Sequence, residues 1–183
     1  DGVDVRDMTQ KELRDKLGYV PQKGVLFSGT IDSNIRYGKP EITDAQVKEA
    51  AEVAQATEFI DTKPEKYESP VSQGGTNVSG GQKQRLSIAR AIAKEPEIFI
   101  FDDSFSALDF KTDSQLRKAL KEYTKDATTV IVAQRISTIL GADQIIVLDD
   151  GHMAGIGTHK ELMANCEVYQ QIARSQLSEE ELA

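Results

Sequence analysis

The chain has 183 residues and a formal net charge of −8, and 39% of its residues are hydrophobic, enough for one domain with a sizeable core. This negative charge and the lack of a basic run argue against a nucleic-acid surface. A single cysteine, Cys166, excludes a disulfide framework and favours a reducing cytosolic setting, while no apolar stretch approaches the roughly 18 residues of a membrane span.

The first predicted strand covers residues 16–20 and stops before a proline, which leaves Gln22 just beyond its end. A short helix is predicted over residues 31–37. A capping-box pattern opens a second helix over residues 43–57. Residues from about 39 to 94 are therefore expected to form a helical subdomain.

The most informative stretch opens a helix predicted over residues 79–93 with two adjacent glycines, Gly80 and Gly81. Glycines let the backbone approach a phosphate, and the free N–H groups and positive dipole end of a helix point at it. Ser79 and Gln82 also form an ordinary capping box, so the residues alone leave both interpretations open.

An apolar run over residues 97–101 predicts a strand, and two carboxylates, Asp102 and Asp103, follow it directly. Further strands are predicted over residues 128–132 and 144–148. A helix predicted between the first two of these strands, at 111–125, completes an alternating pattern. This alternation predicts an α/β fold with a parallel sheet and crossover helices.

The C-terminal part contains a hairpin signal at residues 149–151 that leads into a strand over 152–156. Thr158 begins a capping box that predicts a further helix. The acidic stretch 178–181 is expected to be solvated.

Polar side chains follow three of the predicted strands: Gln22, the Asp102–Asp103 pair and Gln134. Ligands bind outside the carboxyl ends of strands in open parallel sheets, so neighbouring strands would bring all four side chains to one edge. Asp102 can hold Mg²⁺, and Gln22 can give a neutral oxygen to the same ion. On the residues alone, Gln22 also fits a solvated turn position.

In this order, the pieces resemble the nucleotide-binding domain of ABC transporters of the exporter branch. In that family, two such domains sandwich two ATP molecules and drive attached transmembrane domains. The similar segments are the signature at residues 78–82, the Walker B strand at 98–102, the D-loop at 106–109, the Q-loop at 20–22 and an altered pre-signature segment at 69–75.

The resemblance implies an ABC-type ATPase fold of the P-loop NTPase class, in one domain over residues 1–183. Its ATPase core would comprise residues 1–38 and 95–183. No G-x-x-x-x-G-K-[ST] phosphate loop occurs in the sequence. Because that loop comes before these segments in the family, the chain is expected to lack the N-terminal part of the domain.

ATP and Mg²⁺ are the cofactors that the resemblance implies. It assigns Asp102 and Gln22 to the metal, and Asp103 and Gln134 to catalysis. The residues expected to contact nucleotide are Gln22, Ser79, Gly80, Gly81, Gln82 and Asp109. Asp109 would lie between the two sites of a dimer, although it also fits a helix N-cap.

Two positions depart from the family pattern. Asp103 stands where hydrolysing members carry Glu, and a carboxylate withdrawn by one methylene can lower the rate on the order of 10²-fold. Gln134 stands where they carry His, and an amide cannot take the protonated form of an imidazole. The signature is intact. We therefore expect a weakly hydrolytic site of its own, a signature that completes a partner's site, and a heterodimer.

The function implied by the resemblance is that of the ATP-hydrolysing subunit of an exporter at the cytoplasmic face of a bacterial plasma membrane. Its partners would be a second nucleotide-binding domain and transmembrane domains, with no nucleic acid, and the chain alone would be inactive. Two alternatives stay open. One is a soluble ABC ATPase of DNA repair, chromosome organisation or ribosome function, and the other is a regulatory module that binds nucleotide without hydrolysis. The run at 147–162 resembles exporters.

Overall fold

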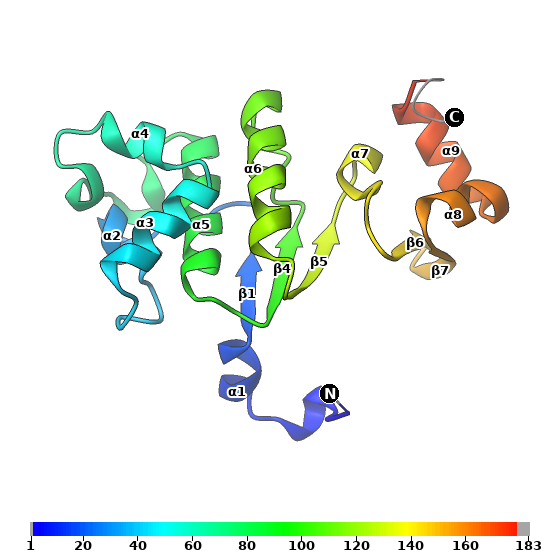
Figure 1. Ribbon diagram of the computed structural model, residues 1–183, viewed down its shortest axis with the longest axis horizontal. Helices are drawn as coiled ribbons and strands as arrows, with labels where there is room; N and C mark the ends of the chain where they lie inside the picture. Colours follow the sequence, from blue (N-terminus) through cyan, green and yellow to red (C-terminus); the bar gives the residue numbers. More distant parts are fainter. Residues whose placement is uncertain (1, 179–183) are drawn as a thin grey trace. The chain divides into compact units, whose positions relative to one another are not determined.

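The computed structural model describes residues 2–178, so the acidic stretch from Glu179 onward lies outside the described residues. The chain forms two compact units, Asp1–Val132 and Ala133–Ala183 (Figure 1). The expected single domain over residues 1–183, with its helical subdomain at 39–94, stays a prediction. No helix within residues 2–178 is both long and apolar enough to cross a membrane.

A three-stranded parallel sheet forms the centre of the first unit. Its strands are β1 (Leu17–Val20), β4 (Ile98–Asp102) and β5 (Thr128–Val132), in the order β1-β4-β5. Tyr19 of β1 pairs with Ile100 of β4, which pairs in turn with Val130 of β5. The predicted parallel sheet is therefore confirmed for these three strands.

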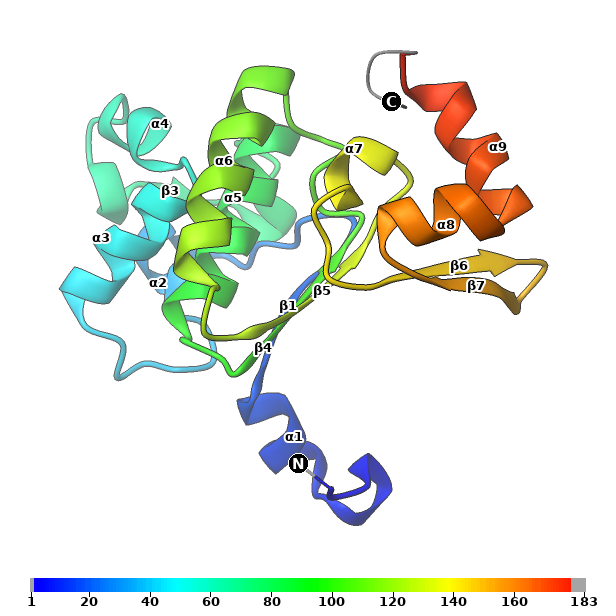
Figure 2. The ribbon, with the colours of Figure 1, turned by 45° about the vertical axis from the view of Figure 1, so that its right-hand side comes forward.

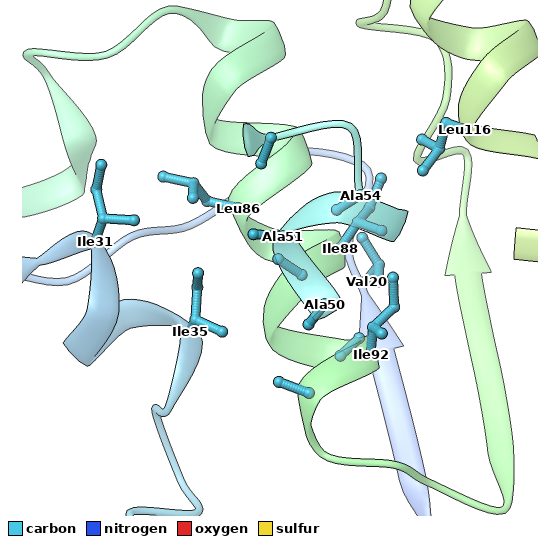
Figure 3. Packing of buried hydrophobic residues seen from close by; sticks show 14 of the residues in the cluster. Val20, Ile31, Ile35, Ala50, Ala51, Ala54, Leu86, Ile88, Ile92 and Leu116 are labelled. Carbon is cyan, nitrogen blue, oxygen red and sulfur yellow. The ribbon is translucent and has the colours of Figure 1, made fainter. Parts of the chain in front are cut away.

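One face of this sheet is covered by two long helices, α5 (Gly80–Ala93) and α6 (Phe110–Tyr123) (Figure 2). Because side chains alternate along a strand, Phe99 and Phe101 of β4 both point into the core on that face. Figure 3 shows Ile88 and Ile92 of α5 beside Val20 of β1. These helices carry the chain from β1 to β4 and from β4 to β5, as crossover connections require.

Shorter elements fill the rest of the first unit. In chain order, these are the 3-10 turn η1 (Val5–Asp7), α1 (Gln10–Asp15), β2 (Gly29–Thr30), α2 (Ile31–Ile35), α3 (Asp44–Val53), α4 (Thr57–Asp61), the 3-10 turn η2 (Lys66–Glu68), β3 (Pro70–Val71) and the 3-10 turn η3 (Gln73–Gly75). Strands β2 and β3 pair with each other in antiparallel fashion. The sequence patterns did not predict α1 or this small sheet.

The helix predicted over residues 43–57 ends earlier, at Val53. Gln55 adopts a left-handed backbone conformation, with φ 56°. The Ala56 N–H donates to the Ala51 carbonyl at 2.7 Å and the Gln55 N–H donates to the Glu52 carbonyl at 2.9 Å. This hydrogen-bond pattern is a Schellman motif, which stops α3 and lets α4 begin in a new direction.

Over residues 133–178, the second unit contains a β-hairpin and three helices: α7 (Ile136–Ile139), β6 (Ile145–Asp149), β7 (His152–Gly157), α8 (His159–Asn165) and α9 (Glu167–Gln176). The predicted hairpin turn is confirmed, with Asp150 at φ 45° and Gly151 at φ 77°. The strand predicted at 144–148 was expected in the parallel sheet, but β6 is bonded to β7 in an antiparallel pair. The Asp-Gly turn joins these two strands, which form a sheet of their own within the described residues.

Candidate functional site

The carboxyl ends of β1 and β4 bring three of the predicted site residues together. Asp102 is the last residue of β4, and Asp103 follows it with φ 45°. The Asp103 N–H donates to the Val132 carbonyl at the end of β5, at 2.9 Å. Nε2 of Gln22, just past β1, donates to Oδ2 of Asp103 at 3.0 Å. The predicted meeting of these side chains at one sheet edge is therefore observed.

Tyr19 is a further member of this cluster that the sequence patterns did not single out. Its hydroxyl donates to Oδ2 of Asp102 at 3.1 Å, and this hydrogen bond to a carboxylate raises the pKa of Tyr19. Tyr19 pairs with Ile100, two residues before Asp102, so both side chains lie on the same face of the sheet. Side chains along neighbouring strands alternate between the two faces with a period of two, and this pattern was the sequence signal that could have identified Tyr19.

The N-terminus of α5 is organised by its own residues. Oγ of Ser79 accepts the Gln82 N–H at 3.2 Å, and Oε1 of Gln82 accepts the Ser79 N–H at 3.1 Å. The capping-box interpretation is therefore confirmed. The capping box does not exclude phosphate binding at this helix N-terminus, because the N–H groups of Gly80 and Gly81 lie in the first helical turn and have no partner within the helix. Gly80 has open space around the position of a Cβ atom.

Asp109 begins α6 as its N-cap and accepts the Thr112 N–H at 3.0 Å. This hydrogen bond lowers the pKa of Asp109. The N-cap interpretation is confirmed, and the interface role stays a prediction. Ser106 lies in the same turn, and its hydroxyl donates to the Asp103 carbonyl at 3.0 Å.

Gln134 belongs to the second unit, so its predicted place beside Gln22, Asp102 and Asp103 stays a prediction. Within its own unit, the Gln134 carbonyl accepts Nε2 of Gln176 at 2.9 Å. Oε1 of Gln176 accepts the Ile136 N–H at 2.8 Å. The end of α9 thus holds the segment around Gln134, through a residue that sequence reasoning missed.

The residues at the edge of the sheet fit a magnesium ion in the chemistry of their donor atoms. Mg²⁺ takes hard oxygen ligands and is held by one or two carboxylates together with substrate phosphates. Asp102 supplies a carboxylate. Gln22 donates from its amide nitrogen to Asp103, so its Oε1 is the atom that would serve an ion.

The sequence profile of the ABC transporter family matches residues 1–106, more than half of the chain. The chain belongs to the ABC transporter family. Its fold is that of an ABC ATPase, because 98% of it aligns with a bacterial Atm1-family ABC exporter solved with ATP bound, at 40% identity and a TM-score of 0.93. It covers 32% of that exporter chain.

Curated relatives support the same family. An uncharacterized ABC transporter ATP-binding protein of Mycobacterium tuberculosis is 46% identical over 179 residues, or 96% of this chain and 30% of that protein. A Staphylococcus aureus protein named for multidrug export ATP-binding and permease functions is 45% identical over 172 residues, or 94% of this chain. The chain thus spans about 30% of the length of these ABC relatives.

Two buried polar residues of this ABC domain hold the backbone that leads to the site. Oγ of Ser104, with 0% exposure, donates to the Val20 carbonyl at 2.8 Å. Gln84, on the buried side of α5, is hydrogen-bonded to the loop that follows β1. A polar residue at a core position of an amphipathic helix was the available signal for Gln84.

Proposed function

We propose that this chain is the ATP-binding and ATP-hydrolysing part of an ABC exporter. In this proposal, hydrolysis at the interface of two nucleotide-binding domains drives substrate transport across a membrane. The observation that carries the proposal is the contact of Gln22 with Asp103, at 3.0 Å, beside Asp102 at the ends of adjacent parallel strands. The similarity to exporters over nearly the whole chain supports it.

Each residue at this edge has a distinct part in the proposed reaction. Bound Mg-ATP supplies the γ-phosphoryl group that is transferred to water. Asp102 would hold the metal, and Tyr19 orients its carboxylate through a hydrogen bond. Asp103 orients the attacking water and accepts its proton. Gln22 fixes the direction of the Asp103 side chain through its amide nitrogen, and its Oε1 would give an oxygen to the metal. Gln134, in the second unit, has a predicted part at the same site, where it would donate a hydrogen bond to the γ-phosphate.

We also propose that the chain's own site is weakly hydrolytic and that its signature completes the site of a partner. Asp103 and Gln134 support the first part, because they stand at the positions where hydrolysing members of the family carry Glu and His. The ordered N-terminus of α5 supports the second part. A homodimer would contain two weak sites, so the proposal favours a heterodimer. The partners are then a second nucleotide-binding domain and transmembrane domains, at the cytoplasmic face of a bacterial plasma membrane.

One alternative is a regulatory module that binds ATP without hydrolysis. It is favoured by the short side chain of Asp103, whose Oδ2 already accepts a hydrogen bond from Gln22. A soluble ABC ATPase has no such specific support, since the relatives named above are transporter proteins.

Single-turnover hydrolysis by the complete assembly, purified from membranes, tests the proposal. We expect two phases of equal amplitude, a fast one from the partner's site and a slow one from this chain's site. A single fast phase that consumes the ATP of both sites would contradict the weak site. A fast phase that consumes the ATP of only one site, with no slow phase after it, would favour the non-hydrolysing module. Full activity without a membrane component would favour the soluble ATPase.

A further inference from the structure

The loop that follows β1 is held against α5 by one buried side chain. Gln84 is only 1% exposed, and both ends of its amide are used. Oε1 accepts the Gly24 N–H at 2.9 Å, and Nε2 donates to the Pro21 carbonyl at 3.1 Å. Gln22 and Lys23 are the two residues between these anchor points. Gln84 thus fixes the backbone on both sides of Gln22.

The loop also lies so close to α5 that it leaves no room for a side chain at Gly24. A Cβ atom there would lie 2.8 Å from the Lys83 carbonyl oxygen and 2.9 Å from Oγ of Ser87. These atoms belong to the helix, and the carbonyl is backbone, so relief would require the loop to move. Glycine at position 24 therefore allows the approach that the two hydrogen bonds of Gln84 need.

Farther along the loop, Arg90 of the same helix continues the attachment. Its Nη1 donates to the Val25 carbonyl at 2.9 Å, and its Nε donates to the Asn34 carbonyl at 2.8 Å. Asn34, with 1% exposure, in turn accepts the Phe27 N–H at 2.9 Å. From Pro21 to Phe27, the loop is therefore fastened to α5 and to α2 by Gln84, Arg90 and Asn34, none of which is assigned to the metal.

We infer that Gln84 is a positioning residue for Gln22, and that it sets where the Gln22 amide stands relative to Asp102 and Asp103. The inference rests on the proposed function, in which Gln22 gives an oxygen to the metal. Gln84 touches neither metal nor nucleotide in this assignment. It acts through the backbone of the loop, in the way that outer hydrogen-bond partners orient the direct ligands of a metal.

The test measures metal binding without turnover. The full assembly, with the partner's nucleotide site disabled, is loaded with a non-hydrolysable ATP analogue and titrated with Mn²⁺, and free Mn²⁺ is followed by electron paramagnetic resonance. We expect Gln84→Leu and Gly24→Ala each to raise the half-saturating Mn²⁺ concentration by about tenfold, as Gln22→Ala does. Affinity for the analogue in EDTA should stay within about twofold, which a general loss of structure would not allow.

Two comparisons make the test specific. The double variant Gln22→Ala/Gln84→Leu should bind Mn²⁺ no more weakly than Gln22→Ala alone, because Gln84 acts only through Gln22. Gln115→Leu, at an exposed position of α6, serves as the matched control and should bind Mn²⁺ as the unchanged protein does. Gly24→Ala keeps Gln84 intact, so it tests the same geometry should Gln84→Leu fold poorly.

The outcomes separate this inference from the proposed function. A shift with Gln22→Ala but none with Gln84→Leu or Gly24→Ala overturns the positioning role alone, and so does a double variant whose two losses add. No shift with Gln22→Ala means that Gln22 is not a metal ligand, which overturns that part of the proposed function and the inference with it.

Discussion

The N-terminus of α5 and the carboxyl end of β4 are both assigned to nucleotide. They differ in how far apart in the sequence their contacting residues lie. Ser79 and Gln82 cap each other across three residues. At β4, Gln22 and Asp103 meet across 81 residues, and Tyr19 and Asp102 across 83. A local motif keeps its geometry wherever its helix forms, whereas the end of β4 depends on the register of three strands. Substitutions at the two places should therefore differ in size and reach.

The largest effect concerns the phosphate-binding loop, which neither the N-terminus of α5 nor the end of β4 supplies. Since the sequence has no G-x-x-x-x-G-K-[ST] loop, the 183-residue chain alone should bind Mg-ATP with a dissociation constant above about 1 mM. Calorimetric titration of the isolated chain measures this. A micromolar constant would show that β4 and its neighbours hold nucleotide by themselves.

The next largest effect is expected at α5. In the full assembly, Gly80→Asp should lower hydrolysis at the partner's site about 10²- to 10³-fold, because a carboxylate would occupy the place of the γ-phosphate at the helix N-terminus. An acidic residue there suits the helix dipole, and a Cβ at Gly80 meets no atom within 4 Å, so the fold should persist.

The matched control for this variant is Gly141→Asp, since Gly141 is also exposed and has open space around a Cβ atom. Steady-state ATPase activity should be unchanged in the control. Near-normal activity in Gly80→Asp would mean that the N-terminus of α5 does not meet nucleotide.

A gain of function is expected at β4. Asp103→Glu together with Gln134→His should speed hydrolysis at this chain's own site, by up to about 10²-fold, since a well-placed base contributes at least that much. The measurement is single-turnover hydrolysis with the partner's catalytic Glu mutated and nucleotide occupancy confirmed. Unchanged rates would place the cause of slowness elsewhere, and a fast rate before reversion would remove the argument for a heterodimer.

The same contrast explains what the sequence could predict. The capping boxes and the Asp-Gly turn were predictable because a few adjacent residues specify them. The meeting of Gln22 and Asp103 at one sheet edge could be predicted from the order of parallel strands, and the resemblance to a known family predicted the chemical roles of these residues. The end of α3 was missed because Gln55 adopts a left-handed conformation that its residue type does not announce. Gln84 was missed because its partners are backbone atoms of a distant loop.

The smallest predicted effect tests the difference in range directly, with two serines whose hydroxyl groups are hydrogen-bonded to the backbone. Ser79→Ala removes a helix cap, which is worth about 1 kcal/mol. Ser104→Ala leaves the buried Val20 carbonyl without the bond that its hydroxyl donates at 2.8 Å, at a cost of about 2 kcal/mol.

Amide hydrogen exchange in the full assembly measures both the size and the reach of these changes. In Ser79→Ala, exchange should rise about fivefold and only in the first turn of α5, because the packed remainder of the helix does not depend on its cap. In Ser104→Ala it should rise about 30-fold in β1 as well as in β4, since the lost bond joins the two strands. If the exchange changes in Ser104→Ala stay confined to its own turn, then β1 and β4 are not held in register by this contact. The geometry between Gln22 and Asp103 would then have to be maintained from the α5 side, through Gln84.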